Sequence, residues 1–224
     1  MTRQRIHRAR LLLAGLFISL GTVQAQKIEV GGSLGGMLYK GDVSPRPDPR
    51  TIQPAAGLFF RYNATRSLSF RAGVATGHIK GDDNLSNDPL QQARAYAFRS
   101  TISELTADVE YNFRNYKPLP KARNWTPYVF AGLGIFNCKN SVVRARGMLS
   151  FPLGVGVKYE IKRPWSVGAE FGTRFTRFDY LDGLGERTFG VTAAKTGQSN
   201  TALSDNYSYV AITLSYTFYK VVCP

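Results

Sequence analysis

The chain has 224 residues, enough for one good-sized domain or two small ones. It carries 29 lysines and arginines against 15 aspartates and glutamates, a formal net charge of +14. Its two cysteines, Cys138 and Cys223, are too few for a disulfide framework, and neither has a second cysteine or a histidine at metal-ligand spacing. The sequence therefore predicts neither a metal site nor a cofactor.

Residues 1–25 have the pattern of a secretory signal peptide. Four arginines precede an apolar run at residues 11–20, and Val23-Gln24-Ala25 closes the segment with a small residue. Removing it lowers the net charge from +14 to +10, because it holds four arginines and no acid. The apolar run is shorter than the roughly 20 residues that a membrane helix needs. No later run approaches that length, so we expect any membrane crossing within residues 26–224 to consist of strands.

The mature chain shows eight runs in which apolar and polar residues alternate, the pattern of a strand with two different faces. These runs lie near residues 28–39, 54–63, 68–80, 98–113, 127–137, 148–161, 165–178 and 207–219. Connections after the odd runs are long, whereas those after the even runs are "ATRS", "RNYKPLPKARNWT" and "KRP". Short turns at one end and long loops at the other are typical of outer-membrane barrels. The sequence predicts an all-β fold: an eight-stranded antiparallel up-and-down transmembrane β-barrel in the outer membrane, with a short periplasmic C-terminal tail.

A tyrosine recurs near the end of each even run. These residues are Tyr62, Tyr111, Tyr159 and Tyr216. An up-and-down barrel brings them to one end, where tyrosine rings form an interfacial girdle between the apolar band and the head groups.

The segment "ELTADVEYNF" places Leu105, Val109 and Phe113 on one face of a strand and carboxylates on the other. A soluble barrel turns its apolar face inward and a membrane barrel turns it outward, so alternation alone does not distinguish them. The polar face of the other runs mixes charges of both signs with glycines, which suits the narrow lumen of a small barrel. We therefore expect the apolar face to contact lipid. The predicted lumen charge network consists of Arg61, Arg71, Glu104, Asp108, Glu110, Lys158, Glu170 and Arg174.

Three patterns resemble catalytic or nucleotide-binding sites. "GGSLGG" at residues 31–36 lies in a strand pattern with no helix after it, which favours strand glycines over a phosphate loop. His78 is the only histidine after the signal, and a rim triad with Asp82 or Asp83 lacks a marked serine. The lumen carboxylates have many basic neighbours, which favours ion pairs over a glycosidase pair. The sequence predicts that the protein is not an enzyme.

The three connections after the even runs hold seven basic residues and no acid, whereas the long connections are mixed. The basic residues are Arg66, Arg114, Lys117, Lys121, Arg123, Lys162 and Arg163. Both termini share this side, so we expect a strongly positive periplasmic face. Solvated charge, contact with lipid head groups and docking of an acidic periplasmic partner all remain open. Nucleic acid is not favoured, because no basic helix or stacking platform accompanies the charge.

The two cysteines fall at opposite ends of the predicted barrel. Cys138 ends the fifth run and Cys223 lies in the tail, about a membrane thickness apart, too far for a disulfide. Cys223 is therefore a thiol or a site of intermolecular disulfide formation.

Several segments together resemble the PorG-type outer-membrane barrel of the type IX secretion system. They include "KGDDNLSNDPLQQARAYAFRSTISELTADVEYNF", "FPLGVGVKYEI", "WSVGAEFGTRFTRFDYLDGL" and "ITLSYTFYKVVCP". The resemblance implies a structural component that ties a periplasmic ring, made of the lipoprotein PorK with PorN, to the outer membrane. The basic connections and Cys223 would then face the ring. The alternative is a small channel or a ligand- or lipid-binding barrel, although eight strands leave an interior that side chains just fill. A lipid-modifying enzyme built around His78 is a third reading.

Overall fold

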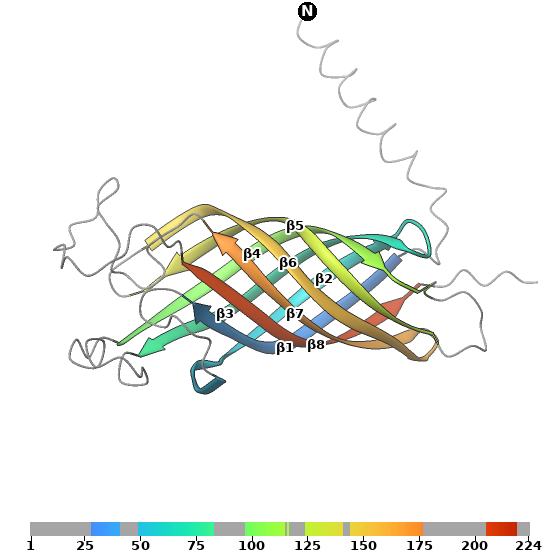
Figure 1. The fold of residues 1–224 in the computed structure, drawn as a ribbon, viewed down its shortest axis with the longest axis horizontal. Coiled ribbons are helices and arrows are strands. Elements are labelled where there is room, and N and C mark those ends of the chain that lie inside the picture. Colours follow the sequence, from blue (N-terminus) through green and yellow to red (C-terminus); the bar gives the residue numbers. More distant parts are fainter. Residues whose placement is uncertain are drawn as a thin grey trace, which may run out of the picture.

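The computed structural model describes residues 28–40, 49–82, 97–114, 116, 124–140, 144–176 and 205–218. The predicted signal peptide and Asp83, Lys117, Lys121, Arg123 and Cys223 lie outside the described residues. The described chain forms a single closed sheet in which each strand pairs antiparallel with the next, and the last strand pairs with the first (Figure 1). The predicted eight-stranded up-and-down barrel is confirmed.

The strands are β1 (Ile28–Lys40), β2 (Gln53–Asn63), β3 (Leu68–Asp82), β4 (Ala97–Asn112), β5 (Trp125–Lys139), β6 (Arg144–Lys162), β7 (Trp165–Thr176) and β8 (Asn206–Thr217). A short 3-10 helix, η3 (Pro49–Thr51), precedes β2. Every strand boundary lies within four residues of the predicted one, and the largest difference is at the start of β6. Alternation therefore located all eight strands.

The two ends of the barrel differ. We call the end that carries the β2–β3, β4–β5 and β6–β7 connections the turn end, and the opposite end the loop end. The β2–β3 turn is closed by the Thr65 hydroxyl, which accepts hydrogen bonds from the backbone N–H groups of Ser67 (3.2 Å) and Leu68 (2.8 Å). The start of β1 and the end of β8 lie at the turn end as well.

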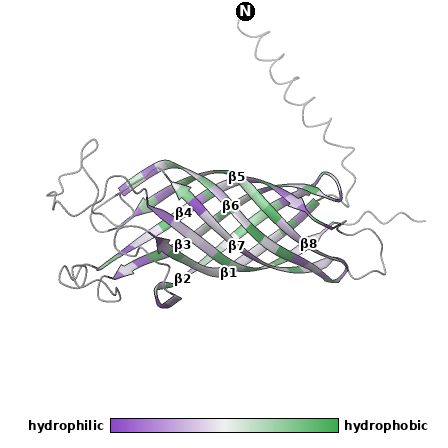
Figure 2. Cartoon of the chain, viewed as in Figure 1, coloured by the Kyte–Doolittle hydropathy of each residue, from purple (hydrophilic) through white to green (hydrophobic). Residues whose placement is uncertain are grey.

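The outward face of the barrel is apolar. Leu34, Leu58 and Leu105 are 72%, 67% and 56% exposed, and Val109 and Phe113 are exposed too, as the pattern of β4 predicts. Figure 2 shows hydrophobic residues along the strands and hydrophilic ones toward both ends of the barrel. Such a continuous exposed apolar surface requires lipid around it.

Aromatic side chains ring the exterior of the turn end. Tyr111, Trp125 and Tyr159 are exposed there, and the Trp165 and Tyr216 rings meet edge to face with centroids 5.3 Å apart. Tyr62 occupies the matching outward position at the end of β2, opposite Ile28. The girdle predicted from the four tyrosines is present, and both tryptophans of the chain belong to it.

The interior is divided into two parts. Toward the loop end it holds apolar and aromatic side chains, which we call the apolar plug: Met37, Tyr39, Ala55, Ile79, Phe98, Ile102, Phe136, Cys138, Tyr207, Tyr209 and Ala211. Toward the turn end it holds charged side chains.

No helix among the described residues is long and apolar enough to cross a membrane.

Candidate functional site

The structure buries all eight predicted lumen residues, and Glu110 lies at the centre of one group of them. Its carboxylate lies 2.5 Å from the Lys158 ammonium, 2.9 Å from Arg61 Nε and 3.2 Å from Arg71 Nε. Arg61 and Arg71 are direct cross-strand neighbours on β2 and β3. Like charges at such positions repel each other, and the Glu110 carboxylate offsets this by lying between them.

A second group surrounds Arg71. Its guanidinium lies 3.2 Å from Asp108 Oδ2 and 2.6 Å from Glu170 Oε2, and the Tyr128 hydroxyl donates to the same Glu170 oxygen at 2.9 Å. The guanidinium also lies 4.7 Å from the centroid of the Phe130 ring, a cation–π distance. Arg71 thus joins β3, β4, β5 and β7 across the lumen.

A third group lies nearer the apolar plug. Arg174 on β7 pairs with Glu104 on β4 at 2.9 Å, and the Tyr207 hydroxyl donates to Glu104 at 2.7 Å. Buried charges are tolerated when they are paired and their remaining hydrogen-bonding sites are filled. All three groups are paired through contacts between strands far apart in the sequence, although Asp108 Oδ1 in the second group is buried without a hydrogen-bond partner.

Glu29 is a lumen residue that the sequence reasoning missed. Its carboxylate pairs with Arg61 at 2.5 Å and accepts a hydrogen bond from the Ser215 hydroxyl at 2.6 Å. The sequence did contain a signal, because Glu29 alternates in step with the inward-facing positions of the first run. It was not included among the predicted lumen residues because it lies at the very start of that run.

Tyr116 was also missed, and no sequence signal marks it. It follows β4 at the turn end, yet it is only 5% exposed, and the Lys158 ammonium lies 5.8 Å from the centroid of its ring. Burial raises the pKa of the Tyr116 phenol well above its ordinary value, and Glu29 acts in the same direction. A neutral aromatic ring therefore covers the turn end of the lumen, and the apolar plug fills the loop end.

The turn end also carries exposed basic side chains. Arg66, Arg114 and Lys162 are exposed, and Arg114 lies over the Trp125 ring at 4.6 Å. Arg163 is partly neutralised by Glu160 at 2.9 Å. The predicted docking residues Lys117, Lys121 and Arg123 belong to the same connection as Arg114, but they and Cys223 lie outside the described residues.

The other candidates from the sequence have ordinary structural roles. Residues 31–36 lie within β1, and His78 faces outward on β3, with its Nδ1 3.1 Å from the Thr101 hydroxyl. The described ranges hold no group of three or more histidines, cysteines, aspartates or glutamates that could bind a metal.

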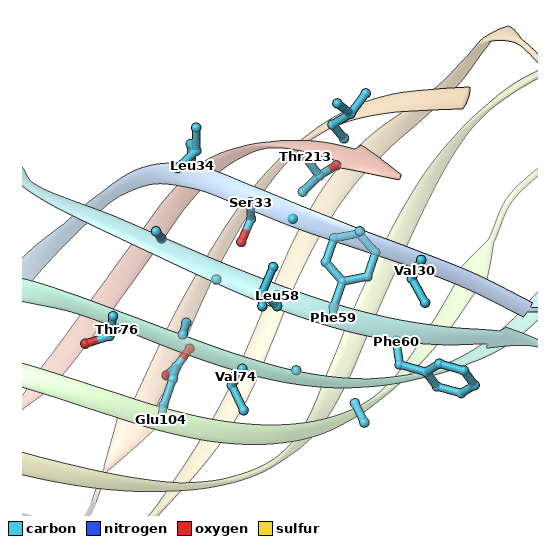
Figure 3. Close-up of a pocket in the computed structure, with 18 of the residues that line it drawn as sticks. Val30, Ser33, Leu34, Leu58, Phe59, Phe60, Val74, Thr76, Glu104 and Thr213 are labelled. Atoms are coloured by element: carbon cyan, nitrogen blue, oxygen red, sulfur yellow. The ribbon is translucent and has the colours of Figure 1, made fainter. Parts of the chain in front are cut away.

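A hollow lies along β8, β1, β2, β3 and β4, with further lining residues from β5 and β7, and its lining is mostly apolar. Figure 3 shows Leu34 and Ser33 on opposite sides of β1, and Leu58 near Val74 on the neighbouring strand. Glu104 is the only charged residue among the described residues that line it, and it is already paired with Arg174. The hollow therefore offers apolar surface rather than a polar site.

An eight-stranded antiparallel barrel with a charged, filled interior, an apolar exterior and an aromatic girdle is an outer-membrane β-barrel. The chain belongs to the family described as "Domain of unknown function (DUF6089)", whose model matches residues 8–224. A search of curated proteins found no match.

Several solved structures are similar to this chain at low sequence identity. Neisserial surface protein A (NspA) is 13% identical with a TM-score of 0.49, over 85% of this chain and 97% of that chain. Ail of Yersinia pestis is 13% identical with a TM-score of 0.47, over 86% and 99%. The N-terminal β-barrel domain of Pseudomonas aeruginosa OprF is 15% identical with a TM-score of 0.42, over 85% and 98%. These likenesses concern the fold alone.

Proposed function

We propose that this barrel is a non-enzymatic membrane anchor whose turn end docks a periplasmic partner. The filled lumen is the observation that carries this proposal. Three interlocked ion-pair groups, the Tyr116 ring and the apolar plug occupy the interior, so the described barrel offers function at its surfaces. A basic, aromatic-ringed turn end fits an acidic protein surface next to the membrane.

The sequence resemblance to PorG-type barrels supports a particular partner. In this proposal the barrel is part of the type IX secretion machinery and anchors the periplasmic ring of PorK and PorN to the outer membrane. Arg66, Arg114 and Lys162 are exposed and available for such docking. Lys117, Lys121, Arg123, Arg163 and Cys223 complete the proposed surface.

Charge reversal tests the docking surface. Replacing Arg114, Lys117, Lys121 and Arg123 with glutamate should release the ring proteins from a tagged barrel purified from detergent-solubilised outer membranes. The barrel should stay folded, because Arg114 is exposed and the other three residues belong to the same connection between two strands. A matched control reverses Lys40 and Arg50, two exposed cations at the loop end, and should keep the ring bound.

The same purification examines Cys223. Under non-reducing conditions the proposal predicts a barrel–partner band that a reductant splits and that a Cys223→Ser variant lacks. Equal recovery of the ring by the charge-reversed and wild-type barrels, each shown to be folded by its heat-modifiable gel mobility, would refute the docking surface.

A further inference from the structure

The exterior of the loop end carries a group of cations on four adjacent strands. We call it the basic rim; it consists of Lys80, Arg99, Lys139, Arg144 and Arg146. All are exposed except the half-buried Lys80, which lies 3.3 Å from Asp82. Asp82 is the only carboxylate on the outward face of β3 to β6 within the described ranges.

The strand register sets cations of the rim directly against each other. Lys80 is the cross-strand partner of Arg99, and Lys139 is the partner of Arg144. Like charges in such positions destabilise a sheet. In the lumen the pair Arg61 and Arg71 has the Glu110 carboxylate between its members. Outside, no described carboxylate pairs with Arg99, Lys139 or Arg144, so the rim has the chemistry of an anion site.

A β-bulge in β6 turns Arg144 outward. Met148 pairs with Phe136 and Ala145 with Cys138, so two residues of β6 lie opposite one residue of β5. Gly147 accommodates the bulge with a φ of 71°, and its backbone N–H donates to Asn137 Oδ1 at 2.9 Å.

Without the extra residue, alternation back from Ser150 would place Arg144 on the lumen side. The bulge instead packs Ala145 against the apolar plug and sets Arg144 beside Lys139 on the exterior. The fold therefore uses a local irregularity to bring two cations together.

The rim lies directly beyond the lipid-facing band. Ile135 and Leu149 are cross-strand partners, are 49% and 61% exposed, and lie just below Lys139 and Arg144 on the same strands. The other half of the barrel is different. At the loop end of β1, β2, β7 and β8, Lys40 is the only charged residue among the described outward positions.

We propose that the basic rim binds the phosphate groups of a glycolipid in the leaflet at the loop end. Arginine and lysine at this depth match phosphate oxygens, and arginine binds them through two parallel hydrogen bonds. The acyl chains of the same molecule would lie over Ile135 and Leu149. A lipid satisfies both the cationic and the apolar surface, which a soluble polyanion does not. This site is on the opposite end of the barrel from the docking surface and is independent of it.

The test uses the mature full-length barrel in detergent, with bisphosphorylated lipid A as the probe and native mass spectrometry to measure affinity. Wild type should bind lipid A in preference to its dephosphorylated form and to phosphatidylcholine. Replacing Lys139 and Arg144 together with alanine should weaken binding by about tenfold or more, because charge-assisted contacts are lost. Lys40→Ala, at the same end on the other half, should leave the affinity unchanged.

Thermal unfolding of the same samples separates a ligand site from a structural role. Without lipid, the double alanine variant should unfold no earlier than wild type, because it removes a like-charge pair. Lipid A should raise the unfolding temperature of wild type more than that of the variant. Equal binding of dephosphorylated lipid A, an unchanged affinity in the double variant, or equally tight binding of soluble polyphosphate would each overturn the proposal.

Discussion

Arg71 shows at the scale of one residue how the lumen is held together. Its guanidinium contacts Asp108, Glu110 and Glu170, and it lies over the Phe130 ring. Removing one member of a buried charge cluster lowers the free energy of unfolding by more than the intact cluster contributes to it, because the remaining charges stay buried without a partner. Arg71 is therefore the side chain whose loss the barrel should tolerate least.

Arg71→Met should lower the free energy of unfolding by about 3–5 kcal/mol. Arg66→Met, at an exposed turn position five residues away, should change it by less than about 0.5 kcal/mol. Urea unfolding of the refolded barrel in detergent micelles measures both. Adding Glu170→Gln to Arg71→Met should recover part of the loss, because it removes a carboxylate that has lost its partner. Similar losses in the two single variants would contradict this role.

The sequence predicted many of the lumen residues but not all of them. The alternation within a strand was enough to predict that Arg61 and Glu110 face the lumen, because a charge among glycines on an alternating strand faces the lumen of a small barrel. Tyr116 could not be found in this way, since its burial depends on how a connection folds back over the barrel. The pairing of Arg174 with Glu104 depends on barrel closure, which brings β7 opposite β4.

At the scale of elements, all eight strands could be located from the sequence, because a two-residue period continues through each of them. The bulge in β6 could not. It breaks the period at Arg146 and Gly147, and the sequence reading accordingly began this strand at residue 148 instead of Arg144. A rule that reads parity from one end of a strand gives the wrong face beyond a bulge, and here it would place Arg144 of the basic rim in the lumen.

Glycines in the strands differ in the space that surrounds them. A Cβ added to Gly154 would meet the carbonyl oxygen of Phe171 and come within 2.5 Å of the Phe130 ring and 2.6 Å of Gly172 Cα. One added to the outward Gly32 would meet only ordinary contacts, at 3.6 Å and beyond. Close packing inside the barrel, rather than turn geometry, thus requires glycine at position 154.

Gly154→Ala should therefore destabilise the barrel by about 1–3 kcal/mol, the usual cost of overpacking. Gly32→Ala should be neutral or slightly stabilising, because it adds a methyl group to the lipid-facing wall and restricts the unfolded chain. The fraction of folded barrel, read from heat-modifiable gel mobility across a urea series, compares the two. An equal effect of both substitutions would show that the effect of alanine on stability comes from strand propensity and not from packing in the lumen.

The described residues form a closed barrel with buried side chains along its interior. Phe130 and the ion-pair groups occupy the turn-end half, and Tyr39, Phe136 and Tyr207 occupy the loop-end half. An eight-stranded barrel has room for its side chains and little else. The sequence could predict this closure from strand number and composition, whereas the division into an ionic and an apolar half emerges only from the structure.

Reconstituted into a planar bilayer, the barrel should give no stepwise conductance at any applied voltage. Heat-modifiable gel mobility of the same preparation shows that folded barrel is present in the bilayer, so that an absence of conductance cannot be due to an absence of protein. Discrete openings from the folded wild-type barrel would mean that the lumen rearranges, and would favour the channel reading over the anchor.

The lumen contacts bear on how the protein enters its membrane. Arg71 pairs with Glu170, 99 residues away, and Ser215 bonds Glu29 across the seam between the first and last strands. A partly inserted chain would present these charges to hydrocarbon without their partners, at a cost of several kcal/mol for each ion. The free energy of inserting individual strands is thus unfavourable until β8 pairs with β1 and closes the barrel. We therefore expect assembly to be all-or-none. A chain truncated before Asn206 should accumulate in the periplasm or be degraded there instead of forming a smaller barrel.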